Sequence, residues 1–374
     1  MNKEYTNEQS NLEGLFQKNI NKNFSRNFTH YEEHKDIYLA EILKEIDSSL
    51  IFTREYEHAV GCLTCDSKSN LSCSYFKMPH PSGIALKNQS IFIFSTRTPH
   101  IITEFKLIKE SNYKSKQPIM MPIFSKILPG SLYAHEILAK ENFLYYNATG
   151  WNEIHKTNID MRSKIDLFYS PSFLKTRKPN CCQLNSLTFS ENEGYSTCFS
   201  SIDSEYKPWK DKEGPLKKGS LIRHSDSSSL VRGLTCPHSV RSVDENLFYC
   251  NSGFGELNQC QSDGSENIIL KTLPGFTRGL AISSKYLFIG LSKVQEGKDS
   301  YAPGLNIQKS LCGIAILRRS DHKLISLLSW PNGQQIFDIQ ILPNKLYNNP
   351  RFPQSRDLNS TQPSLDFYNW EVNN

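Results

Sequence analysis

Three histidines open similar stretches of this sequence, and their spacing could bring them to one site. His80, His135 and His238 each precede an apolar run, which a short polar turn joins to a second run of aromatic and β-branched residues. Neutral imidazoles bind Fe, Zn and other borderline divalent metals, and three of them leave positions open for a substrate. A histidine at the start of a strand can equally hold a neighbouring loop by a hydrogen bond. Both interpretations stay open at this stage.

Three further units of the same pattern open with Gln183, Arg278 and Asp338. Arg278 can bind an anionic group through its planar fork of donors, and Asp338 can accept a hydrogen bond or act as a catalytic general base. A glutamine can bind a metal weakly or hold a water molecule. The alternative is that Arg278 and Asp338 pair with each other or with a neighbouring part of the fold.

The predicted site follows from these six openings. Its ligand-binding residues are His80, His135, Gln183, His238, Arg278 and Asp338. Its metal ligands, if it holds a divalent ion such as Fe or Zn, are His80, His135 and His238. Glu136 could orient an imidazole, but adjacent residues of a strand point to opposite faces, so Glu136 could instead face away from the site.

The spacing of the openings predicts the fold. They recur about every 40 to 60 residues, which is the period of β-propeller blades. Each blade is a small antiparallel sheet whose innermost strand runs along a central axis, so the opening residues would ring that axis at one end. We therefore predict an all-β protein, a β-propeller of six blades, with seven as the alternative. A strand near Leu50 would pair with the last unit and close the ring.

The two ends of the chain differ in character from the middle. Residues 1–46 are predicted to form a helical extension, because HYEEHKDIYLAEILKEI from His30 places its apolar residues on one helical face. The propeller domain would span residues 47–344. The polar, proline-bearing tail at 345–374 is expected to lie on the surface or to be partly disordered.

Composition restricts the classes of partner. The net charge of +5 is small for 374 residues, and Lys and Arg are scattered, which argues against nucleic-acid binding. No window approaches the roughly 18 apolar residues of a membrane span, and the N-terminus lacks the pattern of a signal peptide. We therefore expect a cytoplasmic protein whose ten cysteines are reduced and that does not associate with membranes.

The sequence motifs of common enzyme classes are absent. The sequence contains no GxSxG, HExxH, P-loop or GxGxxG motif. Their absence disfavours the common hydrolases and nucleotide-dependent enzymes, and it leaves open whether the protein is an enzyme.

Several segments resemble a bacterial family of uncharacterised, conserved hypothetical proteins, found alone or beside tetratricopeptide repeats. The segments are CPHSVRSVDENLFYCNSGFGEL, LPGFTRGLAI with LFIGLSKV, CGIAIL and IFDIQILP. The resemblance covers roughly residues 50–343, implies a β-propeller-like domain and carries no established activity. Members of that family tend to read Cys-His-Leu-Asn-Gly-Leu where this chain reads Cys182-Gln183-Leu184-Asn185-Ser186-Leu187, so Gln183 stands in place of a histidine.

Three functions agree with this pattern. The leading hypothesis is a propeller that binds a small molecule or a peptide in a polar, histidine-lined axial pocket. The second is a metal-dependent enzyme that uses the axial histidines, with Asp338 or a bound water as the base. The third is an interaction platform whose rim binds another protein.

Overall fold

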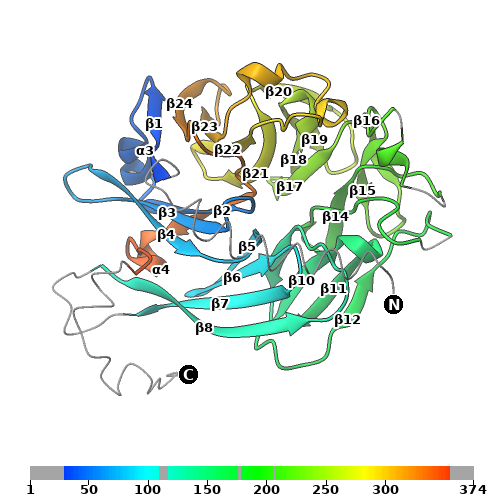
Figure 1. Cartoon of the computed structure of the whole chain (residues 1–374), viewed down its shortest axis with the longest axis horizontal. Helices are drawn as coiled ribbons and strands as arrows, with labels where there is room; N and C mark the ends of the chain where they lie inside the picture. Colours follow the sequence, from blue (N-terminus) through cyan, green and yellow to red (C-terminus); the bar gives the residue numbers. More distant parts are fainter. Residues whose placement is uncertain (1–28, 109–116, 176–177, 205–206, 212, 354–374) are drawn as a thin grey trace.

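Six antiparallel sheets surround a central axis (Figure 1). The computed structural model describes residues 29–108, 117–175, 178–204, 207–211 and 213–353. The predicted six-bladed β-propeller is confirmed, and the alternative of seven blades is wrong for the described chain. Residues 1–28, which belong to the predicted N-terminal extension, lie outside the described residues.

The first three blades are built, from the axis outwards, as follows. Blade one contains β25 (Asp338–Pro343), β2 (Ser48–Arg54), β3 (Ala59–Cys65) and β4 (Leu71–Lys77). Blade two contains β5 (Pro81–Lys87), β6 (Ser90–Ser95), β7 (His100–Ile108) and β8 (Ile119–Leu128). Blade three contains β9 (Ile137–Lys140), β10 (Phe143–Ala148), β11 (Glu153–Asn158) and β12 (Asp166–Tyr169).

The other three blades follow the same order. Blade four contains β13 (Thr188–Ser190), β14 (Glu193–Cys198), β15 (Gly219–Arg223) and β16 (Ser229–Leu234). Blade five contains β17 (Pro237–Val243), β18 (Asn246–Asn251), β19 (Glu256–Gln261) and β20 (Ile268–Thr272). Blade six contains β21 (Phe276–Ile282), β22 (Tyr286–Ser292), β23 (Gly313–Arg318) and β24 (Leu324–Ser329), with β1 (Glu32–Lys35) at its outer edge.

The ring closes through strands from opposite ends of the chain. In blade one, β2 pairs antiparallel with β25 from Ser48 opposite Pro343 to Thr53 opposite Asp338. This pairing confirms the predicted closure by the strand near Leu50. It satisfies the backbone groups of two strands that would otherwise be exposed edges, and it ties the first blade to the sixth.

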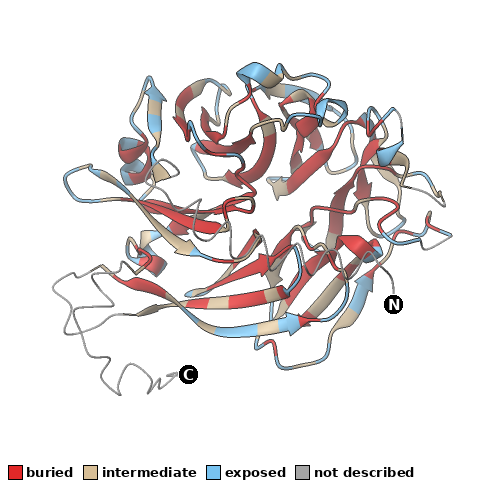
Figure 2. Cartoon of the chain, viewed as in Figure 1, coloured by how far each residue is buried: buried red, intermediate tan, exposed pale blue. Residues whose placement is uncertain are grey.

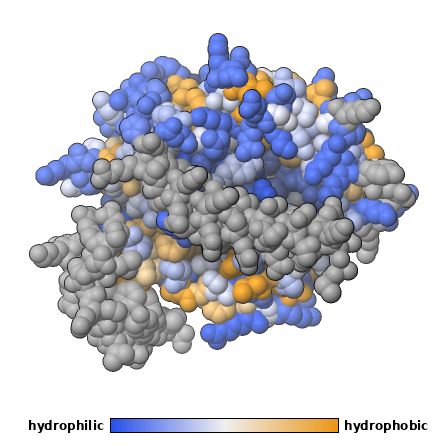
Figure 3. Space-filling view, viewed as in Figure 1, coloured by the Kyte–Doolittle hydropathy of each residue, from blue (hydrophilic) through white to orange (hydrophobic). Residues whose placement is uncertain are grey.

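The second strand of each blade is the most buried. β6, β10, β14, β18 and β22 are buried over nearly their whole length, whereas the outer strands β4, β8 and β20 alternate or are exposed (Figure 2). A strand covered on both faces by neighbouring blades has little contact with water, which favours continuous apolar runs such as IFIF and LFYC. The described surface on the side shown in Figure 3 is mainly hydrophilic, with scattered apolar patches.

Regular helices are short and few in the described chain. α3 (Leu39–Glu45) packs Leu39, Ile42 and Leu43 against blades one and six, and α4 (Asn344–Tyr347) follows β25. Five 3-10 turns lie in loops: η1 (Thr149–Trp151), η2 (Pro208–Lys210), η3 (Ser252–Phe254), η4 (Asp299–Tyr301) and η5 (Ile307–Lys309). None of the helices in the described ranges is long and apolar enough to cross a membrane.

Two predictions about the ends of the chain need correction. The helix expected from His30 to Ile46 forms only from Leu39, because the segment before it pairs as β1 with β24 of blade six. The segment after Pro343 is not a surface tail throughout, because Tyr347 and Phe352 are fully buried between blades one and two. The polar sequence of β1, EEHK, carries no strand signal, and Tyr347 and Phe352 are among the few apolar residues of a polar segment. Residues 354–374 lie outside the described chain.

The innermost strands carry bulges that matter for the site. In β17, His238 pairs with Cys250 and Arg241 with Phe248, so three steps along β17 match two along β18. In a regular strand, residues three apart point to opposite faces, but the extra residue brings both side chains to the axis. A similar irregularity in β21 includes Gly279, whose φ is +75°.

We predict that Gly279→Ala destabilises the fold by about 2–4 kcal/mol, because it combines a left-handed backbone with a collision. A Cβ at Gly279 would lie 2.9 Å from the Cα of Asp338. Gly297 is the matched control, since its φ is +77° with nothing within 4 Å of a new Cβ. Gly297→Ala should cost only about 1–2 kcal/mol in urea unfolding. Equal losses in the two variants would contradict the packing argument.

Candidate functional site

A polar cavity opens at the mouth of the axis where the innermost strands begin. Its volume is about 260 Å³. Four of the predicted residues line it: His135, Gln183, His238 and Arg278. The other lining residues are Tyr56, Phe199, Phe276, Ser292, Lys293, Val294, Gln295, Lys298, Tyr301, Ala302 and Gln335. The predicted convergence of opening residues at one end of the axis is therefore seen for four of six.

His238 is held by a set of hydrogen bonds that fixes its tautomer. Its Nδ1 lies 2.9 Å from the carbonyl oxygen of Cys236 and 3.0 Å from the hydroxyl of Ser252. The Ser252 hydroxyl donates its own hydrogen to the carbonyl of Thr277 at 2.6 Å. Since a carbonyl only accepts, Nδ1 of His238 carries the proton and Nε2 is left as an acceptor.

The same arrangement surrounds His135 in blade three. Its Nδ1 lies 2.7 Å from the carbonyl oxygen of Tyr133 and 3.3 Å from the hydroxyl of Thr149. The Thr149 hydroxyl donates its own hydrogen to the carbonyl of Leu184 at 2.6 Å. The two imidazole rings are nearly parallel, at 18°, with centroids 6.4 Å apart. Nε2 of His135 faces the amide nitrogen of Gln183 at 3.4 Å.

Both imidazoles are neutral at physiological pH. Burial, with the positive charge of Arg278 nearby, lowers the pKa of His135 to about 3 and that of His238 well below its usual value of 6.5. The cavity therefore presents uncharged ring nitrogens beside one buried cation.

Arg278 projects from β21 and packs over an aromatic ring. Its guanidinium carbon lies 3.3 Å from the centroid of the Phe337 ring, and only 8% of the residue is exposed. Burial lowers the pKa of Arg278 to about 10, so the side chain remains charged at neutral pH. Its Nη2 has no hydrogen-bond partner among the described residues, and the same is true of the side-chain oxygens of Gln183 and Gln335.

His80 is not among the residues that line this cavity, which corrects its predicted place. In blade two, Pro81 pairs with the last residue of β6, and in blade five Pro237 pairs with the last residue of β18. His80 precedes its proline, whereas His238 follows its own, so the two histidines are two positions out of register. The φ of His80, +42°, resembles that of Cys236, +50°, and not a strand residue.

The side chain of His80 belongs to a separate buried cluster around Glu55. His80 Nδ1 lies 3.4 Å from Glu55 Oε1, and Arg97 Nε donates to the same oxygen at 2.6 Å. Burial alone would raise the pKa of Glu55, but His80 and Arg97 outweigh it and lower the pKa to about 2. The His58 ring packs edge-on against His80 at 4.2 Å, and burial lowers the pKa of His58 to about 4.

Asp338 lies deeper on the axis, so its predicted place at the mouth also needs correction. Arg241 donates to Glu136 through two nitrogens at 3.0 and 3.1 Å and to Asp338 at 3.1 Å. The other oxygen of Asp338 accepts from the backbone nitrogen of Ile84 at 2.8 Å. Glu136 thus faces away from His135, as the alternation of strand residues allowed. Phe337, which precedes Asp338 in the sequence, is the residue that contacts Arg278 at the mouth.

This Glu136–Arg241–Asp338 network separates the two mouths of the axis. Burial raises the pKa of Glu136 to about 8 against the opposing attraction of Arg241, and burial likewise raises that of Asp338. A carboxyl group enclosed in this way has no path to a ligand in the cavity. The geometry therefore favours a structural role for Asp338 over the predicted role of general base.

The three histidines do not share a metal site. His135 and His238 face the cavity, but His80 is bound to Glu55 instead. Within the described ranges, no group of three or more His, Cys, Asp or Glu side chains is placed to hold a metal ion.

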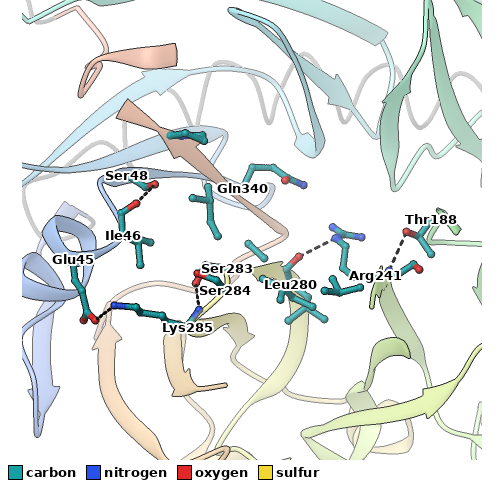
Figure 4. Close-up of a pocket in the computed structure, with 16 residues that line it drawn as sticks. Glu45, Ile46, Ser48, Thr188, Arg241, Leu280, Ser283, Ser284, Lys285 and Gln340 are labelled. Atoms are coloured by element: carbon teal, nitrogen blue, oxygen red, sulfur yellow. Dashed lines mark hydrogen bonds and ion pairs between the residues drawn. The ribbon is translucent and has the colours of Figure 1, made fainter. Parts of the chain in front are cut away.

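A second cavity, of about 670 Å³, lies at the opposite mouth (Figure 4). Arg241 reaches it from the network, and its Nε donates to the carbonyl of Leu280 at 2.9 Å. At its rim, Lys285 pairs with Glu45 at 2.7 Å. The charged groups drawn in this cavity are paired within the protein, so it offers fewer free contacts than the first.

Sequence reasoning missed the aromatic walls of the first cavity. Phe199 follows β14, and Tyr301 lies in the long loop between β22 and β23. Trp209 packs against both, with ring centroids 5.9 Å from Phe199 and 6.5 Å from Tyr301. The sequence signal for these residues is the length of the loops, because the repeated pattern covers the strands and not the insertions between them.

Comparison with known proteins places the chain in a family. Residues 38–349 match the family described as Domain of unknown function (DUF4915). The chain belongs to this family. The expected relation to an uncharacterised family of β-propeller-like proteins is thus confirmed. No curated protein matches this DUF4915 member.

One solved structure supports the fold of this DUF4915 protein. A chain in the crystal structure of a nidogen/laminin complex is similar with a TM-score of 0.54 and 10% identity, over 79% of this chain and 98% of that one. A luciferin-regenerating enzyme matches at 0.44 and 14% identity, over 68% and 77% of the two chains. Virginiamycin B lyase from Staphylococcus aureus matches at 0.42 and 11%, over 75% and 76%. At these identities, the first likeness shows the fold alone.

Replacing Arg241 should destabilise the protein strongly. Arg241→Met leaves two buried carboxyl groups without their cation, so we expect a loss of about 3–5 kcal/mol in the free energy of unfolding. Arg223→Met is the control, because Arg223 and Asp226 form an exposed pair worth about 0–1 kcal/mol. Adding Glu136→Gln and Asp338→Asn to Arg241→Met should restore part of the loss. Similar unfolding curves for the two arginine variants would refute the structural role of the network.

The buried histidines predict how stability depends on pH. The pKa of His135 is lowered in the folded protein, so between pH 6.5 and 3 the unfolded chain binds a proton that the folded chain does not. Stability should therefore fall as pH drops below 6.5, by about 1.4 kcal/mol per pH unit for this histidine. His135→Gln should reduce the slope between pH 6.5 and 5 by that amount, measured by urea unfolding. His30→Gln, at a side chain that is 62% exposed, should leave it unchanged.

Proposed function

We propose that this protein binds a small molecule, or a side chain of a peptide, in the cavity at the strand-start mouth of the propeller axis. The observation that carries this proposal is the set of unsatisfied polar atoms on residues lining one cavity. Arg278 Nη2, Gln183 Oε1 and Gln335 Oε1 are buried and lack partners within the described part of the chain. Each such group costs about 1–3 kcal/mol, and a bound ligand would supply the missing partners.

The architecture supports binding at this place. The Glu136–Arg241–Asp338 network forms a floor below the cavity, and loops from blades four and six form aromatic walls. A concave site with apolar walls and a few fixed polar groups is the usual form of a small-molecule site. The volume of about 260 Å³ suits a small metabolite. The ten free cysteines support a cytoplasmic location, where thiols stay reduced.

The proposal is tested by blocking the cavity. A panel of small acids, neutral amides and amines is screened by thermal unfolding, and at least one compound should raise the Tm of the wild-type protein by about 3 °C or more. Val294→Trp places a large side chain in the wall of the cavity and should abolish that shift. Ile268→Trp, on the exposed outer strand β20, should keep it. A panel without any binder, or binders indifferent to Val294→Trp, would argue against a ligand site here.

A further inference from the structure

The charges around the axial cavity are of one sign. Its described lining includes three cationic residues, Arg278, Lys293 and Lys298, and no Asp or Glu. The two lysines lie at the partly exposed rim, and Lys293 Nζ donates to the carbonyl of Pro331 at 2.5 Å. Only the guanidinium of Arg278 is buried among them. The cavity thus holds one buried positive charge, which a single negative charge on a ligand would balance.

Arg278 differs from Arg241 and Arg54 in having no carboxylate partner among the described residues. Arg241 pairs with Glu136 and Asp338, and Arg54 pairs with Glu57 at 2.7 Å. Among the described residues, Arg278 forms no ion pair. Glu55, the carboxylate that most influences its pKa, is already engaged by Arg97 and His80. A buried guanidinium without an anion is costly, so the arrangement is complete only when a ligand supplies one.

The contact with Phe337 prepares Arg278 for one kind of anion. Stacking on the ring occupies a face of the planar guanidinium and holds its plane, while its N–H groups point outward along the edges. Two N–H groups on an edge match the two oxygens of a carboxylate.

The histidine beside it adds a second requirement. Because Nδ1 of His238 donates to the carbonyl of Cys236, the neutral ring can only accept at Nε2. A ligand that carries a hydroxyl or N–H group can donate to this nitrogen, whereas a second anionic group would be repelled by its lone pair. The neighbouring rings of Phe199 and Phe276, 5.2 and 5.5 Å from His238, provide an apolar wall for the body of the ligand.

We propose that the ligand is a small organic monocarboxylic acid with a hydroxyl or N–H group, its carboxylate bound by Arg278 and its donor group by His238. This inference rests on the proposed function, because it assigns the chemistry of the same cavity. The closed floor and the small volume favour a free acid over the carboxyl terminus of a peptide, which would have to extend out through the mouth.

The first experiment uses wild-type protein and needs no variant. Lactate, 2-hydroxyisocaproate and 3-phenyllactate, each beside its neutral amide, are titrated by calorimetry. At least one acid should bind about 10- to 100-fold more tightly than its amide, because the amide cannot form the charge-assisted pair. Amides that bind as tightly as their acids would overturn the proposal, and so would a panel in which no acid binds.

The second experiment tests the two residues. Arg278→Met should weaken binding of the acid about 10- to 100-fold and bring it to the level of the amide, while Arg232→Met, at an exposed arginine on β16, should not change it. His238→Phe should remove the preference for 3-phenyllactate over 3-phenylpropionate, which lacks the hydroxyl group. Folding of each variant is checked by circular dichroism. Unchanged affinity in folded Arg278→Met would overturn the proposal.

The outcomes separate this inference from the proposed function. Neutral or cationic compounds that bind wild type and lose binding in Val294→Trp would leave the cavity as a ligand site but refute the acid. A capped peptide with a free carboxyl terminus that binds more tightly than every small acid, and than its own amidated form, would refute the choice of a free acid. If no compound of any charge binds, both proposals fail together.

Discussion

The Glu136–Arg241–Asp338 network on the propeller axis is the constraint on which the rest of the site depends. Its three side chains come from blades three, five and one, and backbone groups of Ile84 in blade two and Leu280 in blade six complete it. Taking these ions out of water is costly, so they are stable only when all partners are present together. The network therefore couples five blades, and a displaced blade would leave a buried charge without its partner.

Closing the axis at this level also determines the chemistry of the mouth above it. Because Arg241 pairs with the carboxyl groups of Glu136 and Asp338 in this network, the cavity above it is lined by one buried guanidinium and two uncharged imidazoles. The positive charge of Arg278 helps to keep both histidines neutral, and their Nδ1–H groups are tied to the backbone in the same way. A repeated strand motif thus produces a site with mixed properties, since the residue at each opening differs from blade to blade.

The sequence predicted the blades well because hydrophobic runs and polar turns are local features. The inner hairpins, the closing pair and the approach of the strand openings to one mouth of the axis follow from that repetition. What it could not show is a change of register. His80 is two positions out of register with His238 and lies outside the cavity, whereas Gln183, which likewise precedes the residue paired with the end of the second strand, lines it. One bulge in β17 turns Arg241 towards the axis, and nothing in the local pattern marks these differences. Of the aromatic wall residues, Phe199 and Tyr301 lie in loops, which carry no period, whereas Phe276 begins β21.

Arg241 and Arg278, two buried arginines on the same axis, differ in whether a carboxyl group balances their charge. Both side chains are largely buried and both approach the centre from innermost strands. Arg241 has two carboxyl partners, and their attraction raises its pKa despite burial; the pKa of Arg278, without such a partner, is lowered to about 10. Burying a cation without a partner lowers the stability of the free protein, and binding an anion returns that free energy as affinity. The cost of burying Arg278 without an anion therefore favours a ligand at this place, since an apolar side chain would pack there at lower cost.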